Sequence, residues 1–210
     1  MLLRETWRGK SLGRILFNRT IARECEDLKG TVIDLGGGNH PSHERFWRVR
    51  PEKFIRVDRD AAHKPDVIAD MNDPLPFGDN AADHVLLFSV IYILPDPEAV
   101  LRQIRRVLKP GGTAWIASPF VFAEAPEPHD YARYTQEGLL RMLEGAGFGA
   151  VRIIPVGERF SSAANLLTPF MPRMVRMPAY VLAAALDHCI PKKLRTAHPA
   201  PLGYFCVATK

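Results

Sequence analysis

Three aspartates that could bind a polar ligand stand at the ends of three short apolar runs. Asp34 lies at the end of TVIDL, Asp58 follows KFIRV, and Asp70 follows PDVIA. The apolar and β-branched content of these runs predicts short buried strands over 31–35, 53–57 and 65–69. Ligands of open α/β sheets bind beyond the carboxyl ends of the strands, so we expect these carboxylates on the ligand side of a sheet.

A glycine triplet at 36–38 follows the first run directly and predicts a tight turn where the backbone approaches a ligand closely. Asp58 comes twenty residues after this triplet, the spacing at which a carboxylate meets the ribose of a nucleoside. A carboxylate suits that task because it accepts hydrogen bonds from both hydroxyls of a cis-diol. Pro41 occupies the third glycine position of the dinucleotide fingerprint, which disfavours a pyrophosphate ligand.

The composition is that of one globular domain spanning 1–210, with 47% apolar and 24% charged residues. The net charge of +5 allows an acidic partner but does not require one. The three cysteines form no Cys-x-x-Cys pair and no metal-ligand pattern is evident, so we expect no metal and a reducing, cytoplasmic setting. Neither a signal peptide nor an apolar run long enough to span a membrane is evident. The sequence contains no basic patch interspersed with aromatic residues, so we do not expect nucleic-acid binding.

The remaining elements alternate in the manner of a doubly wound α/β sheet. We expect an N-terminal helical cap within 1–30, in two pieces, and a first main helix within 36–50. Further strands are predicted over 83–90, 113–118, 150–156 and 204–209, and helices over 97–108 and 135–144. Ser89 stands near the carboxyl end of its strand, where it either closes the strand or contacts a ligand.

Two segments lie outside this alternation. The proline-rich loop 119–134 carries His129, Asp130 and Tyr134 close together, which makes it the candidate site for a second substrate. The segment 157–202 is too long for a hairpin turn and is largely apolar, with cations that flank and interrupt it. It is interpreted as a helical lid, as a helical pair packed on the sheet or on another subunit, or as an element lying on a membrane.

Together these motifs resemble a class I S-adenosylmethionine (SAM) dependent methyltransferase of the small-molecule, type 11-like kind. IDLGGGN resembles the first motif of that family, VDRD the second, IADMNDPLPFGDNAADHV the third, and LRQIRRVLKPGGTAWIASPF the later helix and fifth strand. The resemblance implies a Rossmann-like, mostly parallel seven-stranded sheet with an antiparallel last strand and a helical insertion before it. IYIL at 91–94 departs from the family pattern, because many relatives have a Glu-His pair there.

The resemblance also implies SAM as the cofactor and assigns residues to its parts. Around the methionine portion it places five residues, with Ser89 as a further contact: Asp34, Gly36, Gly37, Gly38 and Asn39. Asp58 and Arg59 would bind the ribose, and Asp70 and Met71 the adenine. His40 is expected near the same ligand, as a loop residue like His43 rather than a metal ligand.

The implied reaction is methyl transfer to an oxygen or nitrogen of a small molecule or glycan, by in-line displacement. Our hypothesis is that His129 removes the acceptor proton, Asp130 orients His129, and Tyr134 shapes the pocket with Tyr131. The alternative is that His129 and Asp130 only close the loop, with Arg133 in a structural ion pair. Two other functions stay open, an NAD(P)-dependent oxidoreductase or epimerase and a SAM-binding partner protein without catalysis. The sequence does not indicate the oligomeric state.

Overall fold

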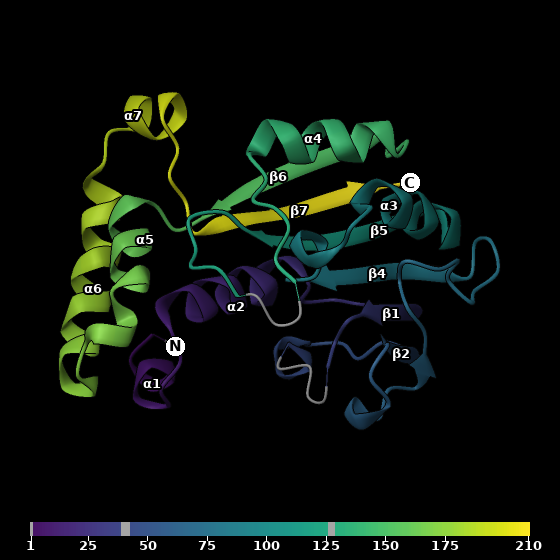
Figure 1. Cartoon of the computed structure of the whole chain (residues 1–210), viewed down its shortest axis with the longest axis horizontal. Coiled ribbons are helices and arrows are strands. Elements are labelled where there is room, and N and C mark those ends of the chain that lie inside the picture. The colour runs from purple at the N-terminus through teal and green to yellow at the C-terminus, as the bar shows by residue number, and fades with distance from the viewer. Residues whose placement is uncertain (1, 39–42, 126–128) are drawn as a thin grey trace.

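A computed structural model describes residues 2–38, 43–125 and 129–210 and shows one seven-stranded sheet (Figure 1). The strand order is β3-β2-β1-β4-β5-β7-β6. The strands are β1 (Thr31–Leu35), β2 (Lys53–Asp58), β3 (Val67–Ile68), β4 (Ala82–Phe88), β5 (Leu108–Pro119), β6 (Ala150–Val156) and β7 (Gly203–Thr209). The first five are parallel, and β7 runs antiparallel to both β5 and β6. The predicted fold class is confirmed, including the antiparallel last strand.

One face of the sheet is covered by the two helices that the sequence predicts most clearly. Helix α3 (Pro97–Val107) begins with Asp96, whose side chain accepts a hydrogen bond from the Ala99 amide. Helix α4 (Gln136–Gly145) is capped in the same way by Thr135. Apolar residues of both helices, including Leu101 and Leu139, are fully buried in the main core cluster.

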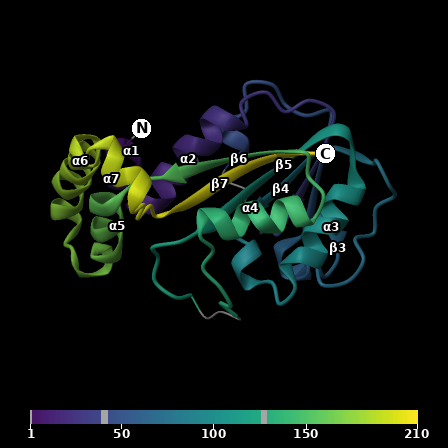
Figure 2. The same ribbon diagram turned by 90° about the horizontal axis from the view of Figure 1, so that it is seen from above.

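The first main helix expected within 36–50 is wrong for the described part of that range. Among residues 36–38 and 43–52, which the structure describes, the one helical element between β1 and β2 is a single 3₁₀ turn, η1 (Glu44–Phe46). Helix α2 (Leu12–Glu24), which precedes β1 in the chain, covers the face of the sheet opposite α3 and α4, where the expected helix would have packed (Figure 2). Its residue Ile21 packs in one buried cluster with Val32 of β1 and Phe205 of β7. The glycine triplet favours a turn over a helix, and α2 supplies the apolar cover that this face needs.

The segment 157–202 is helical, as predicted, and forms a bundle with the N-terminus. It contains α5 (Arg159–Leu166), η4 (Thr168–Phe170), α6 (Arg173–Cys189) and α7 (Lys192–Ala197). In Figure 1, α6 lies beside α1 (Leu2–Trp7), and α7 lies at the opposite end of the bundle. Tyr180 of α6 is fully buried beside Leu12 of α2. The Asn165 side chain accepts a hydrogen bond from the Gly13 amide at 2.8 Å. The insertion therefore packs on α1 and α2, at the carboxyl ends of the parallel strands, rather than on the sheet.

Candidate functional site

A cavity of about 340 Å³ lies beyond the carboxyl ends of β1, β2 and β4. Three aspartates line it, so we call it the acidic cavity. Its lining contains most of the residues that the sequence assigns to SAM: Gly36, Asp58, Arg59, Asp60, His63, Asp70, Met71, Asn72, Ser89, Val90, Ile93, Leu94 and His129. Because parallel strands end at the same edge, side chains from four separate segments converge here.

The glycine turn at the head of this cavity is tightly packed. Gly36 has a φ of 75°, and a Cβ on it would lie 2.6 Å from Cγ2 of Val90. A Cβ on Gly37 would lie 2.2 Å from Oδ2 of Asp34. Gly38 also has a positive φ, 61°. At these positions only glycine allows the backbone to turn this closely against its surroundings.

Asp34 lies behind the turn and is not part of the lining of the acidic cavity. Its carboxylate is 1% exposed, and Oδ2 lies 3.3 Å from Nε2 of the buried His43. The His43 ring is surrounded by three aromatic rings, those of Trp47, Phe54 and Phe88. The sequence treats His43 as a loop residue, whereas the structure places it against Asp34. Asp34 therefore supports the glycine turn from below.

Asp58 has the position that ribose binding requires. Its Oδ2 accepts a hydrogen bond from the Gly38 amide at 3.2 Å, and Oδ1 accepts one from the Asp60 amide at 3.0 Å. Nδ1 of His63 lies 3.1 Å from Oδ2. The two amide bonds fix the carboxylate at the cavity wall, and its remaining lone pairs can accept from a diol. Arg59 is exposed at the rim of the cavity.

Asp70 and Met71 line the opposite side of the acidic cavity, after β3. The Asp70 Oδ1 atom accepts hydrogen bonds from the amide and the side chain of Asn72, at 2.9 and 2.8 Å. The Met71 Cε lies 3.5 Å from the point that a Cβ on Gly36 would occupy. Met71 therefore packs against the glycine turn, next to the Asp70 carboxylate. A flat ring that lies on the Met71 side chain within the cavity would have this carboxylate near its edge, which suits an adenine ring.

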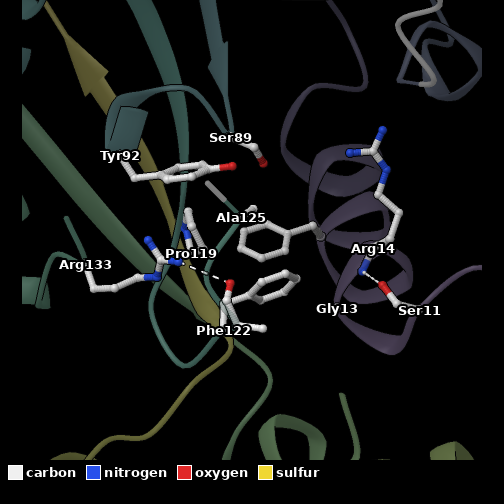
Figure 3. A pocket seen from close by; sticks show the side chains of 11 residues that line it. Ser11, Gly13, Arg14, Ser89, Tyr92, Pro119, Phe122, Ala125 and Arg133 are labelled. Atoms are coloured by element: carbon white, nitrogen blue, oxygen red, sulfur yellow. Dashed lines mark hydrogen bonds between the residues drawn. The ribbon is translucent and has the colours of Figure 1, made fainter. Parts of the chain in front are cut away.

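A second cavity, of about 230 Å³, lies beside the first (Figure 3). Three aromatic rings line it, so we call it the aromatic cavity. Its lining comes from the start of α2, the ends of β4 and β5, and the loop after β5: Ser11, Gly13, Arg14, Phe17, Ser89, Tyr92, Pro119, Phe122, Ala123, Ala125 and Arg133. Ser89, which has a φ of 59°, lines both cavities. The two cavities are therefore adjacent at the carboxyl end of β4, where Ser89 belongs to the wall of each.

The loop 119–134 contributes to both cavities, but its acid is engaged with a cation. Asp130 forms a two-pronged ion pair with Arg133 and accepts a hydrogen bond from the Ala125 amide at 2.9 Å. The Arg133 guanidinium holds the pKa of the Asp130 carboxyl below its ordinary value. In the described parts of this loop, no contact joins Asp130 to His129. The structure therefore contains the structural ion pair, and the orienting role of Asp130 stays a prediction.

His129 and Tyr134 take different places in the structure. His129 lines the acidic cavity, and its ring stacks on Tyr131 with centroids 5.2 Å apart. Tyr134 instead packs against the main core cluster and lines neither of these cavities. Burial raises the pKa of the Tyr134 hydroxyl. The ring of Tyr134 is partly buried against this cluster, and its role in shaping the acceptor pocket stays a prediction.

The aromatic cavity contains residues that the sequence did not single out. Tyr92 belongs to the IYIL segment, and Figure 3 shows its hydroxyl directed toward Ser89. Its ring lies under the Arg133 guanidinium at 5.2 Å. Burial, with the nearby Asp130 carboxylate, raises the pKa of the Tyr92 hydroxyl. The available sequence signal was the departure from the family pattern at this position. Asn39 and His40 lie outside the described residues.

The comparisons with known proteins agree with this geometry. A family model described as Methyltransferase domain matches residues 46–116. The chain is 30% identical over 98 residues to the ubiquinone/menaquinone biosynthesis C-methyltransferase UbiE of Vibrio cholerae, covering 39% of this chain and 38% of that protein. A SAM-dependent methyltransferase from Archaeoglobus fulgidus superposes with a TM-score of 0.63 at 19% identity, covering 100% and 98% of the two chains. The putative methyltransferase complexed with the Haloferax volcanii activator Trm112 gives 0.63 at 21% identity, covering 92% and 88%.

The chain therefore has the fold of the class I SAM-dependent methyltransferases, and the predicted resemblance is confirmed. The segment from η1 through most of β5 carries the Methyltransferase domain match. The chain spans 38% of the length of the UbiE relatives that it matches. The acidic cavity also fits SAM on its own geometry, because the Asp58 carboxylate, the glycine turn and the Asp70–Met71 pair face one space.

Proposed function

We propose that this chain transfers the methyl group of SAM to a small acceptor held in the aromatic cavity. The observation that carries the proposal is that the two cavities lie side by side and share Ser89 in their linings. Asp58 would hold the ribose hydroxyls, and Asp70 with Met71 would hold the adenine. A donor bound in this way has its reactive end toward the glycine turn and the carboxyl end of β4. An acceptor among the aromatic rings would approach from the other side of Ser89.

The chemical demands on the protein are modest. SAM, when bound, supplies an activated methyl group on a sulfonium centre. Much of the acceleration can then come from holding the acceptor atom in line with that group, which the walls of the two cavities would do. Phe17 and Phe122 offer an apolar surface for the body of the acceptor. The raised pKa of Tyr92 keeps its hydroxyl protonated at neutral pH, so Tyr92 would donate a hydrogen bond to the acceptor.

The acceptor atom is proposed to be an oxygen or a nitrogen of a small molecule or a glycan. An acceptor hydroxyl loses a proton during transfer, and His129 is the proposed base because it lines the acidic cavity on the side of the loop 119–134. Asp130 takes no part in this step, since its carboxylate is held by Arg133. His129 would therefore act without Asp130 as its partner.

The experiment is a transfer assay with radiolabelled SAM against a panel of small phenols, amines and glycosides. We expect label in at least one acceptor, and a loss of about 10²-fold or more in kcat for His129→Ala with an oxygen acceptor. His198→Ala is the matched control, because His198 is exposed near α7, outside both cavity linings. Unchanged turnover of His129→Ala at saturating substrate would remove the base role. Binding of SAM without transfer to any acceptor would favour a partner protein without catalysis.

A second candidate is methyl transfer to carbon. The observation in its favour is the likeness to relatives named for C-methylation in quinone biosynthesis. Aromatic rings around the acceptor space also suit a flat, electron-rich ring. Carbon-13 labelled SAM separates the two candidates, because methyl groups bonded to carbon, nitrogen and oxygen resonate in different parts of the spectrum. A product with a carbon-bound methyl would replace the proposal for oxygen or nitrogen.

A further inference from the structure

The turn between α5 and α6 lies at the same end of the bundle as α1 (Figure 1). Large apolar side chains of this turn are exposed to solvent. Phe170 is 83% exposed and Met174 is 88% exposed. Leu167 beside them is 52% exposed, and Trp7 of α1 is 66% exposed. We call these four residues the apolar tip. Isolated apolar residues on a surface are ordinary, but four that are so open on adjoining elements mark an interaction surface.

The apolar tip is one continuous feature, although its parts come from opposite ends of the chain. Helices α1 and α6 are in contact, and the Arg173 guanidinium lies over the Trp7 ring at 5.3 Å. Leu167, Phe170 and Met174 follow one another through the end of α5, η4 and the start of α6. The tip therefore presents aromatic and flexible apolar side chains together with a cation.

The charges around the apolar tip are unbalanced. Residues 157–202 contain six Lys and Arg: Arg173 and Arg176 lie at the start of α6, beside the tip, and the other four lie at the opposite end of the bundle, on α5 and α7. The same residues contain only two Asp and Glu. Both acids are buried at the opposite end of the bundle. Asp187 accepts hydrogen bonds from the Glu158 and Phe160 amides, and Glu158 pairs with Arg159.

The acid next to the tip is also neutralised. Glu5 of α1 is 5% exposed and is paired with Lys10 and Arg45. Arg4, Arg8 and Arg173 are exposed near the same end. The surface around the apolar tip is therefore cationic, and the occupant with matching charge is anionic.

We propose that the apolar tip binds the surface of an anionic lipid bilayer. Phe170, Met174 and Trp7 would enter the boundary between headgroups and acyl chains, while Arg173 would reach the lipid phosphates. The described helices include none that is long and apolar enough to cross a bilayer, so the contact is one of lying on the membrane. A second copy of the chain is a poorer occupant, because a symmetric contact would bring like charges together.

The bundle that bears the tip also builds one wall of the aromatic cavity. The hydrogen bond from Gly13 to Asn165 ties the start of α2 to α5. A Cβ on Gly13 would lie 2.9 Å from the ring of Phe122, which lines that cavity. A membrane-bound tip would thus hold this cavity close to the lipid surface. The membrane contact itself does not depend on the proposed function.

The test is co-sedimentation of the full chain with phosphatidylcholine vesicles, with and without phosphatidylglycerol. We expect binding to the vesicles that contain phosphatidylglycerol and little binding to phosphatidylcholine alone. The double variant Phe170→Ser/Met174→Ser should lose at least about tenfold in partitioning. Ile68→Ser is the matched control, since Ile68 is 63% exposed on β3, away from the bundle. Equal loss in that control would overturn the proposal.

A second readout locates the contact. Trp7 is the exposed one of the three tryptophans, so insertion should shift its fluorescence to shorter wavelength. The shift should vanish in Trp7→Phe, which keeps most of its binding. Absence of binding to either vesicle, or equal binding to both, would overturn the proposal. So would a dimer in sedimentation velocity that the Phe170→Ser/Met174→Ser variant abolishes without any vesicle binding, because a second copy would then cover the tip.

Discussion

Replacement of Gly37 by alanine would test the packing of the glycine turn directly. The added Cβ would lie 2.2 Å from Oδ2 of Asp34, and real Cβ atoms essentially never show a contact under 3.0 Å. Asp34 cannot easily move away. Its strand β1 is paired on both sides, with Arg56 of β2 and Leu86 of β4 opposite it. Its carboxylate is 1% exposed and lies against His43.

The expected cost combines two effects. Overpacking a fixed interior typically destabilises a protein by about 1–3 kcal/mol. Displacing the buried Asp34 carboxylate from its place 3.3 Å from Nε2 of His43 adds about 1 kcal/mol or more, because the contact between a buried acid and the imidazole is weakened. We therefore expect the free energy of unfolding to fall by about 2–4 kcal/mol. With a urea dependence of about 2 kcal/mol per M, the midpoint should fall by about 1–2 M.

The assay is urea unfolding at 25 °C, followed by circular dichroism. Gly78→Ala is the matched control, since no heavy atom lies within 4 Å of a Cβ there and Gly78 is outside the positive-φ group. The control should change the midpoint little or raise it slightly, by reducing the freedom of the unfolded chain. A Gly37→Ala protein that unfolds at the wild-type urea concentration would refute the packing argument for this turn.

Three further predictions concern charge and thiol chemistry. Asp130→Asn should lower the free energy of unfolding by about 1–3 kcal/mol at pH 7, because it breaks the partly buried pair with Arg133. The pKa of Asp130 is lowered in the folded state, so this contribution is present above about pH 4 and is lost as pH falls through the folded pKa, which urea titrations of both proteins would reveal. Glu5→Gln should also lower the free energy of unfolding, because the hydrogen bond from Lys10 helps to lower the pKa of Glu5 to about 2 in the folded protein. The stability that Glu5 adds to the wild type should be complete above the ordinary pKa of 4.5 and should vanish as pH falls toward 2. In the native protein a disulfide reagent should label Cys189 quickly, while Cys206, which is buried with its pKa raised to about 12, should react only on unfolding; equal labelling rates would contradict the packing.

The lining of the acidic cavity was largely predictable from the sequence. Asp58, Asp70 and Met71 each follow a strand, and the geometry of a parallel sheet brings the ends of such strands to one edge whatever the loops do. Asp34 was predictable as part of the turn but not as its buried support. The position of His43 beside Asp34 could not be predicted, because it depends on packing against aromatic rings that are distant in sequence.

The helix predicted within 36–50 could not be judged from the local sequence alone. The pattern of alternating elements predicted a helix there, but the face it would cover is taken by α2. That exchange depends on contacts between Ile21 and distant strands, and short-range periodicity carries no information about them. The aromatic cavity was missed for the same reason, since Phe17, Tyr92 and Phe122 are far apart in sequence.

In the loop after β5, Asp130 has two possible partners in the sequence. Asp130 could have faced His129 or Arg133, and both lie within three residues of it. The bidentate geometry of a guanidinium with a carboxylate favours Arg133, and the Ala125 amide strengthens that arrangement. The sequence allowed Asp130 to pair with either residue, and the conformation of the loop backbone decides that it pairs with Arg133.

The most direct test of the central claim is calorimetric titration of the purified protein with S-adenosylhomocysteine, beside an Asp58→Asn variant and a titration with NADH. We predict saturable binding of S-adenosylhomocysteine to the wild type and no heat with NADH. The variant keeps the shape of the side chain but loses a charged acceptor, so its Kd should rise at least about tenfold. Failure of the wild type to bind S-adenosylhomocysteine, or binding of NADH instead, would contradict the account of the acidic cavity as a SAM site.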